Sequence, residues 1–179
     1  MEELRRQAEG AAFLTRNLAR ARMFQPMPSL VLPPVALSGL SRDLMPSFRR
    51  VHEAMRAGRP VGGWRSRLYE HIGNRLVVVA LDEHREVVGI DMYYIEAGSD
   101  ARRHVHEAYV GVLPDFRSLG IASAMRRLAM TAFSAGGVQA VTTDIAPDNA
   151  ASLASAEHLG FVVRRRSSES LRMLRELPL

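Results

Sequence analysis

A strand, a tight turn and an amphipathic helix follow one another over residues 108–128, and this unit constrains the fold more than any other segment. Tyr109, Val110 and Val112 favour a strand. Pro114 ends the strand, because proline has no N–H for a sheet ladder. Apolar side chains then recur at helical spacing on one face, at Ile121, Met125, Leu128 and Ala132.

The turn within this unit, residues 117–122, has the chemistry of a phosphate site. Gly120 and Ala122 leave a ligand room to approach the backbone. The first turn of the helix offers unpaired N–H groups and the positive end of the helix dipole, and Arg117 adds a fixed positive charge. We therefore expect the whole turn to bind a phosphate-bearing ligand, through Arg117, Ser118, Leu119, Gly120, Ile121 and Ala122.

The spacing of Arg117, Gly120 and Ala122 resembles the Arg/Gln-x-x-Gly-x-Gly/Ala motif of the GNAT superfamily of N-acetyltransferases. Residues 149–161 are similar to that family's Asn…Leu-Tyr…Leu-Gly-Phe segment. With the segments around them, the two signatures cover residues 30–177. The resemblance implies an α+β fold of three layers, with a mixed central sheet of about seven strands and helices on both faces. It also implies that the sheet is splayed between its central strand and the strand that precedes the second signature.

We divide the chain into an N-terminal helical extension with its linker, residues 1–28, and a GNAT domain, residues 29–179. Residues 2–23 of the extension follow helical spacing, and two prolines in the linker end that helix. This helix either packs on the domain or forms a contact in a homodimer. Further helices are expected over residues 42–56, 64–72 and 149–159, and strands over residues 30–35, 75–81, 87–95, 104–112, 138–145, 161–164 and 171–175.

The resemblance implies that acetyl-CoA is the co-substrate. The backbone of Val110, Gly111 and Val112 would pair with the pantetheine arm as another strand would. An N–H near Val112 would face the thioester carbonyl and stabilise the oxyanion that develops during transfer. Asn149 matches the family asparagine on the far side of the cleft. It would bind the arm or the side of the leaving sulfur, or simply cap a helix, and these roles are compatible.

The expected acceptor is a primary amine, which is protonated near pH 7 and must lose a proton before it attacks. Asp144 matches an acid found five residues before the asparagine in some family members. His106 shares the strand parity of Val110 and Val112, so it would point into the same cleft. Glu107 takes that place if the strand contains a bulge. For all three candidates, the alternative is a surface or salt-bridged residue.

One position departs from the family pattern. Many GNAT enzymes place a tyrosine in the last helix to protonate the leaving thiolate, and the corresponding residue here is Ala156. Another group or a water would then act as the acid, or the thiolate would leave unprotonated. A thiol pKa of about 8.5 makes that last route tolerable.

Composition restricts the other chemistry. The chain has no cysteine, which excludes disulfides, thiolate metal sites and an acyl-cysteine intermediate, and we expect no metal. The net charge is +5 and all the basic residues are arginines, a balance that suits an anionic ligand such as a nucleotide cofactor. No stretch reaches the roughly 18 apolar residues of a membrane span, and the N-terminus has no apolar signal core. We therefore expect no membrane partner and a cytoplasmic location.

The leading hypothesis is an N-acetyltransferase that works by direct attack in a ternary complex, on a small-molecule or peptide amine. One alternative is a sensor or scaffold that binds acetyl-CoA without catalysis. A nucleic-acid binder is disfavoured, because the arginines at 164–166 are not accompanied by a series of stacking aromatics. The loops at 58–75, 82–86 and 96–104 are expected to select the acceptor. Trp64, Tyr69 and His71 are candidates to line its pocket, with Trp64 equally consistent with the core.

Overall fold

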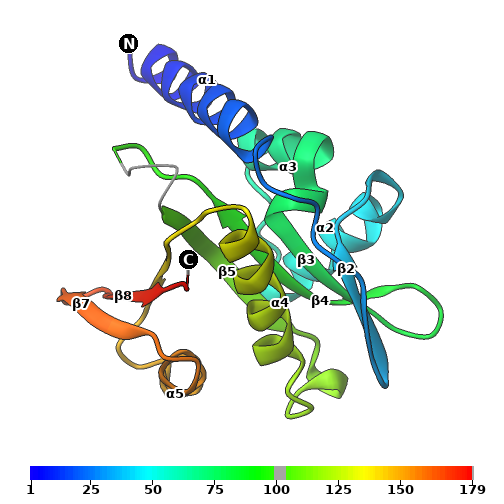
Figure 1. The fold of residues 1–179 in the computed structure, drawn as a ribbon. Helices are drawn as coiled ribbons and strands as arrows, with labels where there is room; N and C mark the ends of the chain where they lie inside the picture. Colours follow the sequence, from blue (N-terminus) through cyan, green and yellow to red (C-terminus); the bar gives the residue numbers. More distant parts are fainter. Residues whose placement is uncertain (99–103, 179) are drawn as a thin grey trace.

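The structure is a computed structural model that describes residues 1–98 and 104–178 (Figure 1). Of the loop expected over 96–104, residues 99–103 lie outside the described residues. Within the described ranges, no helix is both long and apolar enough to cross a membrane. The α-helices are α1 (Glu2–Ala21), α2 (Met45–Met55), α3 (Gly63–Leu76), α4 (Ile121–Ala135) and α5 (Ala150–His158), with short 3₁₀ turns η1 (Arg42–Leu44) and η2 (Pro114–Phe116).

The strands form one mixed sheet in the order β1-β2-β3-β4-β5-β6-β8-β7. The pair β5–β6 is parallel, and the other pairs are antiparallel. The predicted α+β architecture with a mixed central sheet is therefore confirmed. The strands are β1 (Leu30–Leu32), β2 (Val35–Gly39), β3 (Val77–Leu81), β4 (Val87–Tyr94), β5 (His104–Val112), β6 (Ala140–Ile145), β7 (Val162–Arg166) and β8 (Leu171–Glu176).

The sheet has eight strands among the described residues rather than about seven, because residues 30–35 are not one strand. Pro33 and Pro34 separate β1 from β2, and the two strands pair with each other as a hairpin. Two consecutive residues without a backbone N–H suit a turn better than a ladder. The chain after the prolines then continues as β2, which pairs with β3, and β1 becomes the edge strand.

Helix α3 is longer than predicted. Residues 75 and 76, expected to begin a strand, form its last turn. The helix is interrupted at Ile72, the residue at which it was predicted to end, because the backbone there has a φ of −138° and a ψ of 24°, which is not helical. Beyond this kink the chain makes a further helical turn, in which Leu76 is buried in the core. Burial of this turn therefore outweighs the strand propensity of the valine-rich segment that follows.

Helices cover both faces of the sheet (Figure 1). Neighbouring residues of β4 show this directly. The Tyr93 ring packs against Phe133 of α4 at a centroid distance of 4.9 Å. The next side chain, Tyr94, lies on the other face, where the guanidinium of Arg65 from α3 is 4.8 Å from its ring centroid.

The sheet opens between β5 and β6. The parallel pairing runs from His104 opposite Ala140 to Glu107 opposite Thr143 and ends there. Beyond this point, the end of β6 stays paired with β8, whereas β5 stays paired with β4. The predicted splay therefore lies between the expected strands.

A bulge in β5 lies at the same place. Met92 is opposite Tyr109 and Tyr93 is opposite Glu107, so Ala108 has no partner in β4. The extra residue reverses the alternation of side chains. As a result, Glu107 shares the α4 face of the sheet with Val110, and His106 points to the opposite face.

A buried ion pair joins β5 to α4 beside the bulge. The guanidinium of Arg126 donates two hydrogen bonds to the Glu107 carboxylate, Nε to Oε1 at 2.7 Å and Nη2 to Oε2 at 2.8 Å. Both residues are only 2% exposed. A third donor, Nη1, binds Ser155 Oγ at 3.0 Å and so ties α5 to the pair. The planar contact of Arg126 with both oxygens of Glu107 is the strong form of an arginine–carboxylate contact.

Asp91 of β4 completes this buried cluster. It accepts a hydrogen bond from the Tyr93 hydroxyl at 2.7 Å and is fully buried. Burial, and then the charge of Glu107, raise the pKa of Asp91 well above that of an ordinary carboxyl group. Asp91 therefore stays protonated where a surface aspartate would be charged, and Glu107 alone balances Arg126.

Helix α1 is fastened to the end of β4 by Asn17, which is fully buried. Its amide Nδ2 donates to the Ile95 carbonyl at 3.1 Å and to the Phe13 carbonyl at 2.9 Å, and its Oδ1 accepts the Ile95 N–H at 2.6 Å. Close contact with α3 adds to this: a Cβ at Gly10 would lie 2.0 Å from Nε1 of Trp64. The extension thus packs on the domain through a specific polar contact as well as through apolar surface.

We expect Asn17→Ala to lower the free energy of unfolding by about 1 to 3 kcal/mol, because the buried N–H of Ile95 loses its partner, whereas the Ile95 carbonyl keeps the hydrogen bond from Arg16. Urea denaturation followed by circular dichroism measures this change. The matched control is Gln7→Ala on the exposed side of α1, which should stay within about 0.5 kcal/mol of the parent protein. Equal effects of the two substitutions would show that the Asn17 contact does not hold α1 in place.

We expect Asp91→Asn to stabilise the protein increasingly as pH rises. The pKa of Asp91 is higher in the folded state than in the unfolded state. Its contribution to the free energy of unfolding is therefore fully present below the pKa of the unfolded state, and it is lost as pH rises through the pKa of the folded state. Asparagine is always neutral, so its advantage should grow by about 1.4 kcal/mol per pH unit between the two pKa values. Denaturation midpoints of both proteins from pH 4 to pH 9 test this. A difference that does not change with pH would contradict a buried, protonated Asp91.

Candidate active site

A cavity of about 600 Å³ opens where β5 and β6 separate. Its walls come from β5, from the turn before α4, and from the starts of α4 and α5. Of the ten residues predicted to bind the cofactor, nine line this cavity: Val110, Gly111, Val112, Arg117, Ser118, Gly120, Ile121, Ala122 and Asn149. The tenth, Leu119, is not part of the lining, and its side chain is 52% exposed.

The sequence did not indicate several other lining residues, among them Met55, Tyr109, Arg126 and Ser155. Met55 comes from α2, which only the three-dimensional fold brings to the cavity. Arg126 lies one helical turn after Ala122, so the motif and the helical period together would have found it.

The turn before α4 leaves backbone donors free. Ser118 and Gly120 both have positive φ angles, 61° and 74°. Space around a Cβ at Gly120 is open, so this position favours glycine for its backbone conformation rather than for lack of room. No side chain caps the N-terminus of α4. The first N–H groups of α4 and its positive dipole end therefore face the cavity as an anion site.

Arg117 is held against β5 rather than extended into solvent. Its Nε donates to the Val112 carbonyl at 3.1 Å. The guanidinium therefore lies close to the end of the unpaired segment of β5, residues 108–112, which has no partner in β6. An exposed strand edge of this kind accepts an extended chain with amide groups through main-chain hydrogen bonds.

Asn149 combines the two roles considered for it. Its Oδ1 accepts the N–H of Ser152 at 3.1 Å, which caps α5. It also lies in the cavity wall, facing the turn of α4 across the opening.

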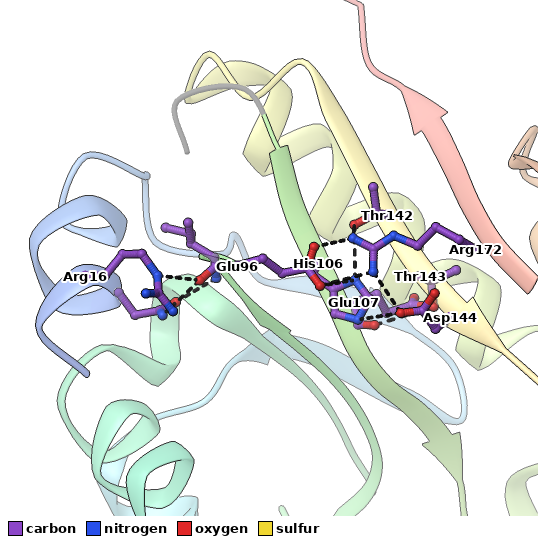
Figure 2. Close-up of polar contacts among 10 residues, drawn as sticks. Arg16, Glu96, His106, Glu107, Thr142, Thr143, Asp144 and Arg172 are labelled. Carbon is purple, nitrogen blue, oxygen red and sulfur yellow. Dashed lines mark hydrogen bonds and ion pairs between the residues drawn. The ribbon is translucent and has the colours of Figure 1, made fainter. Parts of the chain in front are cut away.

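The three candidate bases do not lie together. Glu107 is on the α4 face and is occupied by Arg126, as described above. His106 and Asp144 lie on the other side, where Figure 2 shows them converging with Glu96 and Arg172. A proton acceptor at Glu107 would have to break a buried ion pair, which costs several kcal/mol. The cluster around His106 carries no such requirement.

His106 is the centre of this cluster and is 6% exposed. Its Nδ1 lies 3.1 Å from Thr142 Oγ1 and 3.8 Å from Glu96 Oε1, and its Nε2 lies 3.9 Å from Asp144 Oδ2. Burial lowers the pKa of His106 even though the two carboxylates favour its charged form. A neutral imidazole beside two carboxylates is able to accept a proton and to be stabilised once it is charged.

Arg172 of β8 links the two carboxylates. Its Nη1 donates to Asp144 Oδ2 at 2.8 Å and to Glu96 Oε1 at 3.1 Å, and Nη2 also pairs with Glu96. Burial alone would raise the pKa of Glu96, but the hydrogen bond from Arg172 and the charge of that arginine hold it below its ordinary value. Ligand atoms of Glu96, His106 and Asp144 lie within 4.8 Å of one another, a spacing that suits a metal ion. The guanidinium already binds both carboxylates, so the group is an ion-pair network.

Sequence reasoning missed Glu96 and Arg172. Glu96 lies 76 residues from Arg172 and just beyond the end of β4. For Arg172, the pairing of β6 with β8 would have indicated the contact, because this register places Arg172 opposite Asp144.

The three residues considered for an acceptor pocket are dispersed. Tyr69 is in the core, and its hydroxyl donates to the Tyr93 carbonyl at 3.1 Å. Trp64 packs on α1 and lies under the guanidinium of Arg67. His71 is exposed and lines a separate shallow cavity of about 470 Å³ between α2 and α3. None of them lines the cavity between β5 and β6.

Comparison with known proteins shows to which family this sequence and fold are similar. Residues 40–161, more than half of the chain, match the profile of the acetyltransferase (GNAT) family. No curated protein matches the sequence. Among solved structures, Ard1 from Thermoplasma volcanium has a TM-score of 0.69 at 16% identity, covering 82% of this chain and 99% of that one.

Two further similar structures were determined with acetyl-CoA. The phosphinothricin acetyltransferase of Sinorhizobium meliloti has a TM-score of 0.69 at 20% identity, covering 80% of this chain and 89% of its own. The yncA protein of Salmonella typhimurium has a TM-score of 0.67 at 17% identity, with 81% and 95% covered. At these identities the likeness concerns the fold, and the family follows from the sequence match: the chain belongs to the acetyltransferase (GNAT) family.

Proposed function

We propose that the protein transfers an acetyl group from acetyl-CoA to a primary amine, by direct attack in a ternary complex. The observation that carries this proposal is the unpaired edge of β5, which opens on a cavity closed at one end by the uncapped N-terminus of α4. An extended amide-bearing arm attached to a pyrophosphate matches both features. The acetyl-CoA in two of the similar structures supports this choice of ligand.

The residues of the cavity divide the binding. The turn at 117–122 receives the pyrophosphate, with Arg117 as the fixed positive charge. Val110 to Val112 pair with the pantetheine arm. An N–H near Val112 stabilises the oxyanion when the amine nitrogen attacks the thioester carbon, and one such donor contributes a factor of about 10² to 10³ in rate.

His106 takes the proton of the acceptor ammonium, directly or through one water. It is neutral because of its burial, and it lies where the paired part of β5 ends, next to the splay. Asp144 and Glu96 then stabilise the imidazolium. Glu107 keeps a structural role in this scheme, because Arg126 holds both of its oxygens.

The leaving thiolate meets no tyrosine. Ala156, at the expected position, is fully buried and has no group to donate. Ser155 does line the cavity, and its Oγ accepts a hydrogen bond from Arg126, so its own hydroxyl proton is free to point elsewhere. Ser155 therefore donates a hydrogen bond to the sulfur as the C–S bond breaks. This keeps catalysis ahead of a non-catalytic sensor as the proposed role.

We expect Arg117→Gln to weaken acetyl-CoA binding about tenfold or more, since a charged hydrogen bond to phosphate contributes about 1.5 to 3 kcal/mol. Calorimetric titration of both proteins with acetyl-CoA measures the difference. The matched control is Arg127→Gln, an exposed arginine of α4 outside the cavity, which should bind like the parent protein. Parent protein that does not bind acetyl-CoA would overturn the proposal.

We expect His106→Gln to lower kcat by about 10² to 10⁴ and to remove the acidic limb of the pH–rate profile. In the parent protein that limb should lie below the ordinary histidine range, because burial lowers the pKa of His106 and the base acts when deprotonated. Release of CoA thiol across pH 5 to 9 gives both quantities. Glu107→Gln should mainly reduce the free energy of unfolding. A Glu107→Gln protein that folds normally but has no activity, beside an active His106→Gln protein, would move the base to Glu107.

A further inference from the structure

A second cavity of about 600 Å³ lies beside the His106 cluster, on the face of the sheet opposite α4. It is not part of the cavity between β5 and β6, and the two share no lining residue. Figure 2 labels three of its residues: Arg16 lies on α1, Glu96 lies between Arg16 and His106, and Arg172 lies beyond His106. The complete lining is Arg16, Tyr94, Glu96, Ala97, Arg165 and Arg172.

Positive charge exceeds negative charge in this lining. Arg172 is balanced, because Glu96 and Asp144 both pair with it. Arg16 and Arg165 form no ion pair with a carboxylate of residues 1–98 or 104–178. The charge of Arg165 reaches Glu96 and helps to hold the pKa of that carboxyl below its ordinary value. Even so, Arg16, Arg165 and Arg172 outnumber the two carboxylates Glu96 and Asp144, so the surroundings of the cavity keep a net positive charge.

The position of Arg165 brings it close to a second arginine. In the pair of β7 and β8, Arg165 lies directly opposite Arg172. Like charges at directly opposed positions of neighbouring strands repel each other. Glu96 and Asp144 offset part of this repulsion. An anionic group bound in the cavity would offset more of it and would bind Arg165 by charge-assisted hydrogen bonds.

Arg16 is held in place on the other side of the cavity. Its Nε donates to the Ile95 carbonyl at 3.1 Å, which orients the guanidinium next to the end of β4. Its two terminal nitrogens make no hydrogen bond to the described residues, so they are free to bind a ligand. A third cation, Arg65, lies over the ring of Tyr94 at 4.8 Å and strengthens the positive field at this face.

We propose that this cavity binds an anionic group of the acceptor, so that the substrate is an amine that also carries a carboxylate or a phosphate. This proposal rests on the proposed acetyl transfer. Arg16 and Arg165 bind the anionic group, and the amine at the other end lies toward His106, which contacts both Tyr94 and Glu96 of the lining. A simple ammonium ion would be repelled by the arginines, whereas an anionic tail offsets that repulsion.

The test compares amines that differ only in the charge of the tail. CoA thiol release is measured with glycine, β-alanine and 4-aminobutyrate, and with the amides of the same three acids. We expect kcat/KM to be at least about tenfold higher for the best carboxylate than for its amide. Phosphoethanolamine, compared with β-alanine, shows whether phosphate or carboxylate is preferred. Equal values for acids, phosphate and amides would overturn the proposal.

Substitution of the arginines in the lining tests whether this cavity causes the preference for the anionic amine. Arg165→Gln and Arg16→Gln should each reduce the preference for the anionic amine severalfold, and together they should abolish it. Arg166→Gln, next to Arg165 in β7 but outside the cavity lining, is the matched control and should keep the preference. A preference that survives in the double variant would place the anion elsewhere and overturn the assignment.

A binding measurement separates failure of this proposal from failure of the proposed function. Calorimetric titration of the protein with 4-aminobutyrate and with its amide, in the presence of CoA, requires no turnover. Binding of the acid that Arg165→Gln weakens would support the anion site even if no acetyl group is transferred. Equal or absent binding of both compounds, in a protein that binds acetyl-CoA, would overturn the anion site and leave the acetyl-CoA site standing.

Discussion

The ion pair between Arg126 and Glu107 is the interaction on which the cavity depends. A sheet that opens between two parallel strands loses the ladder bonds that would hold its walls in register. At this point the guanidinium binds Glu107 of β5 with two donors and Ser155 of α5 with a third, from its place in α4. Three elements that border the opening are therefore joined by one side chain. Because both partners are buried, loss of either would leave an uncompensated charge in the interior, at a cost of about 3 to 5 kcal/mol.

The bulge at Ala108 decides how this pair relates to the chemistry. Without it, His106 and Val110 would share a face; with it, Glu107 meets Arg126, and His106 joins Glu96, Asp144 and Arg172 on the opposite face. One extra residue thus separates a carboxylate that holds the structure together from the histidine proposed as the base. The neutral Asp91 is part of the same arrangement, since a second negative charge there would compete with Glu107 for a single cation.

The sequence allowed the parts of the site that depend on local chemistry to be predicted. The turn at 117–122, the cap at Asn149 and the order of strands and helices depend on glycine conformation, capping and periodicity within short windows. Parts that depend on distant contacts were not predictable in this way. Glu96 and Arg172 meet only because β4, β5, β6 and β8 pair in order. The faces to which residues 106 and 107 point depend on a bulge, and the sequence did not decide whether the bulge is present. The hairpin at residues 30–39 was missed for a different reason. The two prolines were interpreted as the end of a strand, whereas they form the turn between two paired strands.

Asn17 connects the N-terminal helix to the residues around His106 through the backbone of Ile95. Its amide binds both the N–H and the carbonyl of Ile95, the residue immediately before Glu96, and the neighbouring Arg16 binds the same carbonyl. The hydrogen bonds that hold α1 on the domain therefore also position one carboxylate beside His106 and one arginine of the second cavity. Since Asn17 is fully buried, α1 cannot leave without exposing unpaired polar groups at the end of β4. The helix is for that reason a structural part of the acceptor side of the proposed site, and displacement of α1 would change the Glu96 position before it affected the cavity between β5 and β6.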